Sequence, residues 1–387
     1  MAPLPPERVA LAGALGRVLA EDLRASSPLP PFDNSQMDGY ALRAADAPRA
    51  GARLPVAFEV FAGDTPGRAL PPGACARVFT GAPVPAGADS VEMQEEVVRR
   101  GASARFRRAA SPGRFVRPAG SDLAAGSIAL PRGSVLDAGA VGLAAALGEA
   151  EVLVHRRPRV GVLATGDEIA PLGRAARPGA IPDSNTHALA AAVLDAGAVP
   201  VVLPLARDDL ASLQRALEAA SGLDALVTTG GVSVGDRDLV RAALAEAGAR
   251  LSFWRVAMRP GRPFTFGRLG RQLLFGLPGN PASALVTFEL FARPALRALQ
   301  GLAGSGRFWV EARLAAPEEK PRELAVYLRG RLRERRDGLW VERLPTQQSG
   351  SVPSMAGLGA LALLPAGVTH VRRGAWVRVL ALRAPSR

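Results

Sequence analysis

Ala225–Asp236 reads ALVTTGGVSVGD, an apolar run that leads directly into a glycine-rich turn and the start of an expected helix. The same order of apolar run, polar turn and capped helix occurs twice earlier, beginning at Val160–Ala164 and at Val199–Leu205. Repeats of strand, turn and helix are typical of a parallel sheet covered by helices. Ligands of such sheets bind beyond the carboxyl ends of the strands. We therefore expect an α/β domain over residues 158–305, with its site at these turns.

The sequence on both sides of this domain predicts β-structure. Short runs punctuated by Pro and Gly, such as Val56–Phe61 and Ser90–Val98, predict a β-domain over residues 26–126. Similar runs, of which Phe308–Leu314 is the first, predict a small barrel or sandwich over residues 306–387. The chain is thus expected to contain more than one domain, in agreement with its 387 residues.

The segments that connect these domains show helical spacing of apolar residues. The spacing occurs over residues 4–24 and returns over residues 134–150. We therefore expect a helical connecting domain built from residues 1–25 and 127–157.

Composition narrows the possible chemistry. Cys75 is the only cysteine and the three histidines lie far apart, so a Cys- or His-based metal site is not expected and carboxylates suited to Mg²⁺ remain. The net charge is +13, but Lys320 is the only lysine among 48 basic residues. We attribute this excess of arginine over lysine to coding bias and give the basic composition less weight as a sign of an anionic partner. Aromatic residues make up only 5%, few for a single-strand binder. No long uncharged apolar stretch occurs, and we expect a cytoplasmic protein without a membrane segment.

Two glycine-rich turns point to an anionic ligand. One is Gly230–Gly235, and the second is Gly276–Ser283, which reads GLPGNPAS and precedes an apolar helical stretch. Glycines allow backbone N–H groups to approach an anion closely. One such turn could equally be a tight connection, but two in one sheet domain favour a ligand.

Charged residues gather near the same turns. The carboxylates are Asp167, Glu168, Asp183, Asp208, Asp236 and Asp238, with Arg255, Arg259 and Arg262 as the basic counterpart. A single Asp at a helix start is usually a cap, but several at one sheet edge repel unless a cation such as Mg²⁺ intervenes. The arginines could hold phosphate or another oxyanion through paired N–H donors.

Seven motifs in order along the chain resemble the molybdopterin molybdenumtransferase family of the MoeA type, which is similar to the C-terminal part of gephyrin. The motifs are PFDNSQMDGYALR (Pro31–Arg43), RPAGSD (ending at Asp122), TGDEI (Thr165–Ile169), PDSN (Pro182–Asn185), GGVSVG (Gly230–Gly235), RPGRPF (Arg259–Phe264) and GLPGNPAS (Gly276–Ser283). The resemblance covers essentially the whole chain.

The resemblance implies a fold and a reaction. The fold is an α/β molybdopterin-binding sheet domain with an inserted β-domain, a helical connecting segment and a C-terminal β-barrel domain. The reaction is the insertion of molybdenum from molybdate into adenylated molybdopterin with release of AMP, in the presence of Mg²⁺. The protein would be a homodimer with a shared active site, in which Asp38 reaches across from the partner. It would act downstream of a molybdopterin adenylyltransferase, without nucleic acid or membrane as partners.

Residue roles follow from the matched motifs. The resemblance implies catalytic roles for Asp38, Asp122, Glu168, Asp208 and Asp238, and metal binding by Glu168, Asp236 and Asp238. It implies substrate binding by Thr165, Gly166, Asp183, Ser184, Asn185, Gly230, Gly231, Ser233, Arg255, Arg259, Pro278, Gly279, Asn280 and Ser283. Asp208 could exchange its role with Asp209, one position along. Arg255 and Arg259 stand where the family commonly has lysine. Because the chain has only one lysine, we interpret both as replacements of lysine by arginine.

Three alternatives remain at this point. The chain could be a molybdopterin adenylyltransferase, although the extra domains and Pro31–Arg43 argue against it. It could be a non-catalytic scaffold. A nucleic-acid role could rest on the basic run Arg99–Arg117, which we interpret instead as the solvated face of a hairpin.

Overall fold

A computed structural model describes residues 2–173, 178–230, 239–302, 304 and 306–386. The chain divides into two compact units, one of Met1–Glu7 with His155–Arg387 and the other of Arg8–Val154. Within the described ranges, no helix combines the length and the apolar character that a membrane crossing requires.

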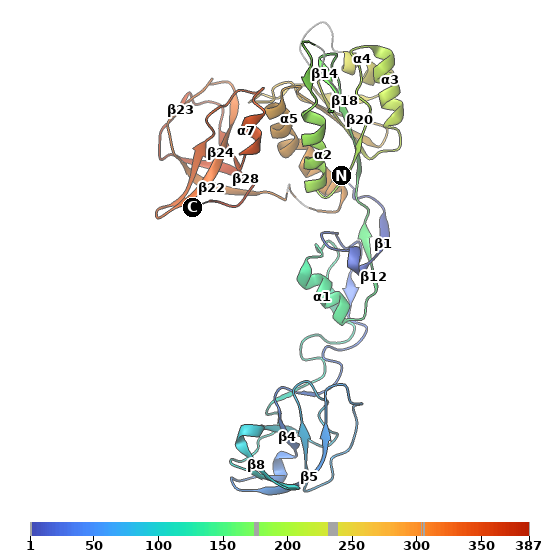
Figure 1. Cartoon of the computed structure of the whole chain (residues 1–387), viewed down its shortest axis with the longest axis vertical. Helices are drawn as coiled ribbons and strands as arrows, with labels where there is room; N and C mark the ends of the chain where they lie inside the picture. Colours follow the sequence, from blue (N-terminus) through green and yellow to red (C-terminus); the bar gives the residue numbers. More distant parts are fainter. Residues whose placement is uncertain (1, 174–177, 231–238, 303, 305, 387) are drawn as a thin grey trace. The chain divides into compact units, whose positions relative to one another are not determined.

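A six-stranded sheet forms the centre of the first unit (Figure 1). The order across it is β16 (Val199–Val202), β13 (Arg159–Ala164), β17 (Ala225–Thr229), β21 (Gln272–Leu277), β20 (Thr265–Leu269) and β18 (Arg250–Phe253). The first four strands are parallel, as the repeats predict, but β20 runs antiparallel to both of its neighbours, β21 and β18. The repeats predict the parallel strands correctly, and the antiparallel strand β20 near this edge is an addition that they do not predict. β20 and β21 are joined by Gly270 and Arg271 alone, a connection that can only reverse the chain.

Helices cover both faces of this sheet. The helices are α2 (Asn185–Asp195), α3 (Leu210–Ala219), α4 (Leu239–Glu246), α5 (Pro281–Thr287) and α6 (Arg293–Leu299), with a π-helical turn at Phe288–Ala292 between the last two. One core joins α2, α5 and α6 to strand residues such as Val160 and Val162. The other joins α3 and α4 to strand residues such as Leu163 and Leu226. Because successive side chains of a strand point to opposite faces, both faces of these buried strands are apolar.

The C-terminal domain is a closed barrel. Its strands are β22 (Phe308–Leu314), β24 (Ala325–Arg335), β25 (Gly338–Arg343), β26 (Ala360–Leu364) and β28 (Trp376–Ala381). β24 pairs with both β25 and β26, which closes the circle through β22 and β28. The barrel is thus the correct choice between barrel and sandwich. The two-residue strand β19 (Met258–Arg259) of the sheet domain also pairs with β24. Outside the closed sheet lie the short helix α7 (Pro353–Ala356) and the paired strands β23 (Glu318–Glu319) and β27 (His370–Val371).

The second unit contains the predicted β-domain. Its six-stranded sheet has the order β7 (Ser90–Met93), β4 (Gly39–Leu42), β6 (Cys75–Val78), β5 (Arg53–Val60), β9 (Ser103–Phe106) and β8 (Val97–Arg100). The single strand expected over Ser90–Val98 is two strands, separated by a 3₁₀ turn at Gln94–Glu96. β3 (Asn34–Ser35) and β10 (Val116–Arg117) form a small separate pair. Cys75 is fully buried, as expected for a small apolar residue, and burial raises the pKa of its thiol to about 12.

The helix expected over residues 4–24 is absent, and this prediction is wrong. The segment contains β1 (Pro6–Ala10), a 3₁₀ turn at Leu11–Gly13 and β2 (Leu23–Arg24), which pair with β12 (Glu151–His155) and β11 (Ile128–Leu130). Pro6 lacks an N–H donor, and Gly16 has a φ of +73° that stops a right-handed helix. The helical spacing over residues 134–150 does correspond to a helix, α1 (Ala138–Ala146). Asp137 caps α1, since its side chain accepts a hydrogen bond of 2.8 Å from the Ala140 N–H.

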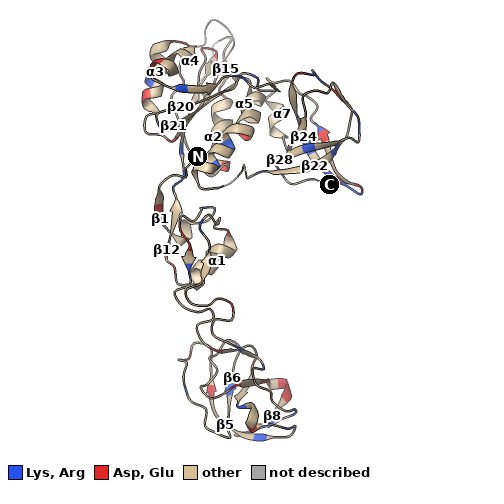
Figure 2. Cartoon of the chain, turned by 180° about the vertical axis from the view of Figure 1, so that it is seen from behind, with Lys and Arg blue, Asp and Glu red and all other residues tan. Residues whose placement is uncertain are grey.

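The basic run Arg99–Arg117 includes the hairpin of β8 and β9, as interpreted from the sequence. Four of its arginines pair with carboxylates: Arg99 with Glu59, Arg108 with Glu96 and Glu92, Arg114 with Glu92, and Arg117 with Asp122. Figure 2 shows Lys and Arg on elements throughout the chain, interspersed with Asp and Glu.

Candidate functional site

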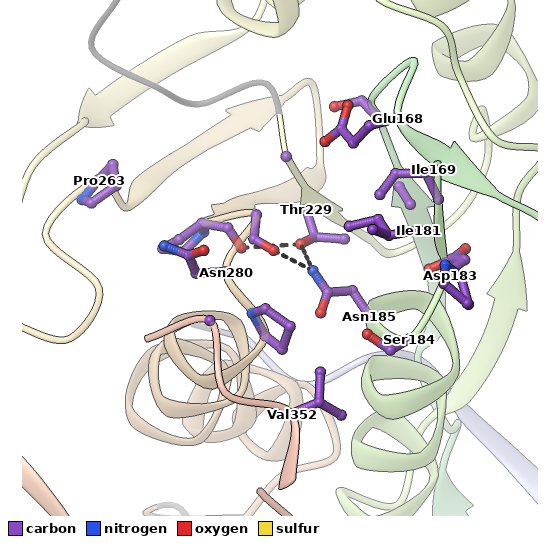
Figure 3. A pocket seen from close by; sticks show the side chains of 18 residues that line it. Glu168, Ile169, Ile181, Asp183, Ser184, Asn185, Thr229, Pro263, Asn280 and Val352 are labelled. Carbon is purple, nitrogen blue, oxygen red and sulfur yellow. Dashed lines mark hydrogen bonds between the residues drawn. The ribbon is translucent and has the colours of Figure 1, made fainter. Parts of the chain in front are cut away.

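A pocket of about 790 Å³ opens at the carboxyl ends of β13, β17 and β21 (Figure 3). Nine of the residues predicted from the sequence line it: Thr165, Glu168, Asp183, Ser184, Asn185, Gly230, Pro278, Gly279 and Asn280. Nine further lining residues were not predicted: Ala164, Ile169, Ile181, Pro182, Thr229, Pro263, Pro281, Gly350 and Val352. The parallel strands thus bring distant motifs to one edge of the sheet, as their topology requires.

A hydrogen-bond network fixes the centre of the pocket (Figure 3). The Asn185 side-chain amide donates to Thr229 Oγ1 at 2.9 Å and to the Gly279 carbonyl at 2.7 Å. The Thr229 hydroxyl in turn donates to the Pro278 carbonyl at 3.0 Å. The first turn of α2 is therefore tied to the ends of both β17 and β21, and these ends cannot move apart without losing hydrogen bonds, of which the Thr229–Pro278 bond is buried.

The two glycine-rich turns approach each other at this point. Gly230 has a φ of +91°, and a Cβ added to it would lie 2.4 Å from the Thr165 carbonyl oxygen. A Cβ on Gly279 would lie 3.4 Å from the Gly230 Cα. Gly230 is therefore required both by its backbone conformation and by the close approach of β13. The two turns leave backbone, rather than side chains, on this side of the pocket.

Thr165, a lining residue, carries a buried hydroxyl without a hydrogen-bond partner among the described residues. Its side chain is only 3% exposed. Buried polar atoms are nearly always paired with protein, water or ligand. Because Thr165 also lines the pocket, a bound molecule or water can supply this partner.

Two carboxylates line the pocket. Glu168 is exposed and lies over Gly166, where an added Cβ would come within 2.7 Å of Glu168 Oε2. Asp183 is half-buried, and its Oδ1 accepts a hydrogen bond of 3.0 Å from the Thr186 N–H in the first turn of α2. Asp183 therefore also caps α2, whereas Ser184 at the N-cap position makes no capping hydrogen bond with its side chain. No arginine or lysine lies among the described lining residues.

The barrel supplies part of the pocket wall through Gly350 and Val352. The preceding residue, Ser349, accepts a hydrogen bond from Asn280 Nδ2 at 3.1 Å, and its carbonyl accepts one from the Ala282 N–H at 3.0 Å. Asn280 thus stands at the N-cap position of α5, but its side chain contacts the barrel instead of capping the helix. The only local signal for this contribution is a polar, glycine-containing turn, Gln348–Ser351, within a strand-rich region.

Arg329 holds this turn from inside the barrel. Its side chain is fully buried and donates to Ser354 Oγ and to the Gln348 carbonyl, both at 3.0 Å. Burial lowers the pKa of this guanidinium. The buried arginine therefore positions the turn that forms the pocket wall.

Comparison with known proteins identifies the family. The chain matches the family models described as MoeA N-terminal region (domain I and II) over residues 1–148, probable molybdopterin binding domain over 161–298, and MoeA C-terminal region (domain IV) over 311–382. A molybdopterin molybdenumtransferase from Nostoc is 38% identical, covering 97% of this chain and 88% of that protein. The chain belongs to the MoeA family. A Bacillus subtilis protein of the same name is 36% identical, covering 97% of this chain and 90% of that protein.

The fold agrees with this assignment. A crystal structure of a molybdopterin biosynthesis MoeA protein from Pyrococcus horikoshii matches with a TM-score of 0.87 and 31% identity, over 99% of this chain and 96% of that one. The MoeA architecture of an α/β sheet domain, an inserted β-domain, a connecting segment and a C-terminal barrel is therefore confirmed.

The arginines predicted from the MoeA motifs are not among the described lining residues of the pocket. Arg255 and Arg259 are both exposed. Arg255 stacks over the Trp254 ring at 4.2 Å, and Arg259 lies in β19. Gly261 packs against α5, where an added Cβ would lie 2.4 Å from Thr287 Cγ2, and the nearby Pro263 lines the pocket. The role of Arg255 and Arg259 in substrate binding remains a prediction.

The other residues predicted in the sheet domain do not line the described pocket. Gly166 and Ser283 are buried beside the pocket without lining it, and Asp209, not Asp208, caps α3 through a 2.7 Å bond from the Ser212 N–H. Gly231, Ser233, Asp236 and Asp238 lie outside the described residues. Within the described part of the chain, no three His, Cys, Asp or Glu side chains gather as a metal site, and Mg²⁺ binding stays a prediction.

Asp38 and Asp122 belong to the second unit of the MoeA chain, Arg8–Val154. Asp122 pairs with Arg117. Asp38 Oδ1 accepts hydrogen bonds from the Thr80 N–H at 2.8 Å and from the Thr80 hydroxyl at 2.7 Å. These two hydrogen bonds hold the pKa of Asp38 below its ordinary value of 3.8, and the bond from the Thr80 backbone N–H has the larger effect. Asp38 is therefore ionised at neutral pH, and this stabilising charge is lost only as the pH falls through the lowered pKa.

We expect Thr80→Val to raise the pKa of Asp38 part of the way back toward 3.8. Valine keeps the backbone donor but removes the hydroxyl that favours the charged form. Carboxyl carbon chemical shifts measured by NMR across acid pH would report the change, and Thr80→Ser should restore the original value. Asp337, whose pKa is lowered by Trp340 in the barrel, serves as an internal control and should not move. An unchanged Asp38 pKa in Thr80→Val would contradict the assignment of the hydroxyl bond.

Proposed function

We propose that this chain is a molybdopterin molybdenumtransferase. It binds adenylated molybdopterin and molybdate and hydrolyses the phosphoanhydride bond, so that water adds across the bond and AMP is released. Molybdenum binds to the two dithiolene sulfurs, and one molybdate oxygen leaves as water with the two thiol protons. The relatives that cover most of its length bear this name. The single observation that supports the proposal best is the pocket where Gly230 and Gly279 bring two backbone turns together beside Thr165 and Glu168.

The described residues suit a phosphate-bearing pterin. Backbone N–H groups at glycine-rich turns can approach phosphate oxygens without a side chain in between. The buried Thr165 hydroxyl can pair with an oxygen of the same ligand. The Asn185 network keeps these groups in place before the substrate binds. The loss of conformational entropy on binding is therefore small. The dithiolene supplies the sulfur ligands, and the protein needs no cysteine for them.

Mg²⁺ is part of this proposal. The described pocket lining holds two carboxylates, Glu168 and Asp183, and no basic side chain, although the proposed substrates are anions. Mg²⁺ commonly binds one or two carboxylates together with substrate phosphates, and the donors present fit that pattern. Glu168 would hold the ion, with Asp236 and Asp238 as further candidates. When bound, Mg²⁺ neutralises charge that develops on the leaving phosphate.

Molybdate is the second proposed anion. Arg259 and Arg262 are exposed on the segment that leads to Pro263 in the pocket lining. Guanidinium groups bind tetrahedral oxyanions through paired N–H donors and stay charged at all relevant pH values. We therefore propose that this segment delivers molybdate to the bound pterin.

We further propose that the protein acts as a homodimer in which a second copy supplies Asp38. The support is the family resemblance at Pro31–Arg43 together with the ionised, hydrogen-bonded state of Asp38. A carboxylate fixed by Thr80 can orient a bound substrate.

The deciding experiment uses purified protein, adenylated molybdopterin and Mg²⁺, with and without molybdate. We expect AMP release that requires both molybdate and Mg²⁺, measured by chromatography of the nucleotides. AMP release at the same rate with and without molybdate would contradict the proposal. ATP-dependent adenylation of molybdopterin would indicate an adenylyltransferase, and binding without turnover would indicate a scaffold.

A further inference from the structure

Four side chains of the β-domain stack on one another. The Arg77 guanidinium lies 5.2 Å from the Tyr40 ring centroid and 4.7 Å from that of Phe79. The Phe79 ring stacks on Phe61 with centroids 4.7 Å apart and ring planes inclined by 12°. The stack ends at Phe61, whose side chain is 50% exposed. The exposed end of the stack leaves the Phe61 side chain accessible to a further ring that can stack on it.

The stack is held rigidly. Arg77 Nη1 donates to the Gly39 carbonyl at 3.0 Å, and Nη2 donates to Gln94 Oε1 at 2.6 Å. The Phe61 backbone N–H donates to Asp64 Oδ2 at 2.8 Å. A flat aromatic face that is fixed before binding loses little conformational entropy when another ring stacks on it.

The carboxylate of Asp38 is linked to the stack through Thr80, the residue that follows Phe79 in the sequence. Phe79 is followed by Thr80, and Thr80 fixes the ionised Asp38. Both bonds from Thr80 reach Oδ1, and the second oxygen can accept a hydrogen bond from a ligand. An aromatic stack in which Phe79 is followed directly by the residue that fixes a carboxylate matches a heterocycle that combines a π-face with an N–H edge.

We propose that Phe61, backed by Phe79 and Arg77, is a stacking subsite for a flat heteroaromatic ring with an N–H edge. The inference rests on the proposed function, because adenylated molybdopterin contains two such rings, the pterin and the adenine. The subsite lies in residues 8–154 and serves the second copy's substrate if the homodimer forms. It adds binding energy through ring stacking, which tolerates either ring.

Two probes distinguish the rings. Pterin-6-carboxylate is fluorescent, so its binding is measured by fluorescence anisotropy, and AMP binding is measured by calorimetry. We expect Phe61→Leu to weaken the binding of one probe about tenfold, within the range found for base stacking on aromatic residues. Phe61→Tyr keeps the flat ring and should restore the affinity. Phe308→Leu is the matched control, because Phe308 is 77% exposed on the barrel and should leave both affinities unchanged.

Several outcomes would overturn the subsite. They are unchanged affinities in Phe61→Leu, no measurable binding of either probe to the wild type, and a changed oligomeric mass in Phe61→Leu without a change in affinity. The last result would mean that Phe61 is a protein contact. Thermal unfolding shows that the variants are folded, and the probes bind without turnover. Loss of probe binding in Phe61→Leu thus supports the subsite even if the wild type releases no AMP, whereas normal AMP release with an unchanged KM rejects it and leaves the function intact.

Discussion

Glu168→Gln is expected to reduce molybdate-dependent AMP release by about a hundredfold or more, a loss typical of removing one charged group that stabilises a transition state. Glutamine keeps the size of the side chain but removes the negative charge. Glu168 is exposed in the pocket and lies over Gly166, so the change leaves no buried group unpaired. The fold should therefore remain intact, and the loss should appear in kcat. Circular dichroism and steady-state AMP release would measure the two effects separately.

A matched control for this variant is Glu218→Gln. Glu218 is exposed on α3 of the same domain and does not line the pocket, so its AMP release should equal that of the wild type. If Glu168 holds Mg²⁺, raising the Mg²⁺ concentration should recover part of the lost activity, because weakened metal binding responds to mass action. Wild-type rates in Glu168→Gln, or an equal loss in Glu218→Gln, would contradict the role of Glu168.

Gly230→Ala is expected to abolish AMP release and to destabilise the protein strongly. The new Cβ would lie 2.4 Å from the Thr165 carbonyl oxygen, at a φ of +91° that residues other than glycine rarely adopt. Backbone atoms cannot relax as a flexible side chain can, so β13 and β17 must separate at the pocket. We expect the free energy of unfolding to fall by more than about 2 kcal/mol, the sum of a left-handed backbone and a steric clash. Urea denaturation would measure it.

Gly222→Ala separates these two causes. Gly222 also has a positive φ, +75°, but a Cβ there would meet no atom within 4 Å. The free energy of unfolding of Gly222→Ala should fall by only about 1–2 kcal/mol, the cost of the left-handed backbone conformation, and its AMP release should be unchanged. Equal destabilisation of Gly230→Ala and Gly222→Ala would show that the close approach to Thr165 does not contribute to the loss of stability.

The sequence predicted the parallel part of the sheet well because each strand is a buried apolar run. Val160–Ala164 and Ala225–Thr229 match β13 and β17 closely. The antiparallel edge was missed because the short hairpin around Gly270 interrupts the repeat of strand and helix. At the N-terminus, apolar residues fit both helical and alternating spacing, and Pro6 and Gly16 decided for extended structure. Local backbone restrictions thus outweighed periodicity.

Much of the pocket could be predicted because parallel strands end at one edge. Residues that follow those ends, such as Glu168, Asn185 and Gly279, therefore meet without any sequence signal for the contact. Gly350 and Val352 could not be predicted, because they contribute from a barrel turn far away in sequence. Their position depends on the fit between two domains, which no local pattern encodes.

The Ser349 hydrogen bonds to Asn280 and Ala282 have a thermodynamic consequence. A ligand that touches both the sheet edge and the barrel turn favours the state in which these domains are docked. Occupancy and docking are therefore linked equilibria, and each strengthens the other by the same factor. A shortened chain that keeps only the sheet would lose this reciprocity together with one side of its cavity.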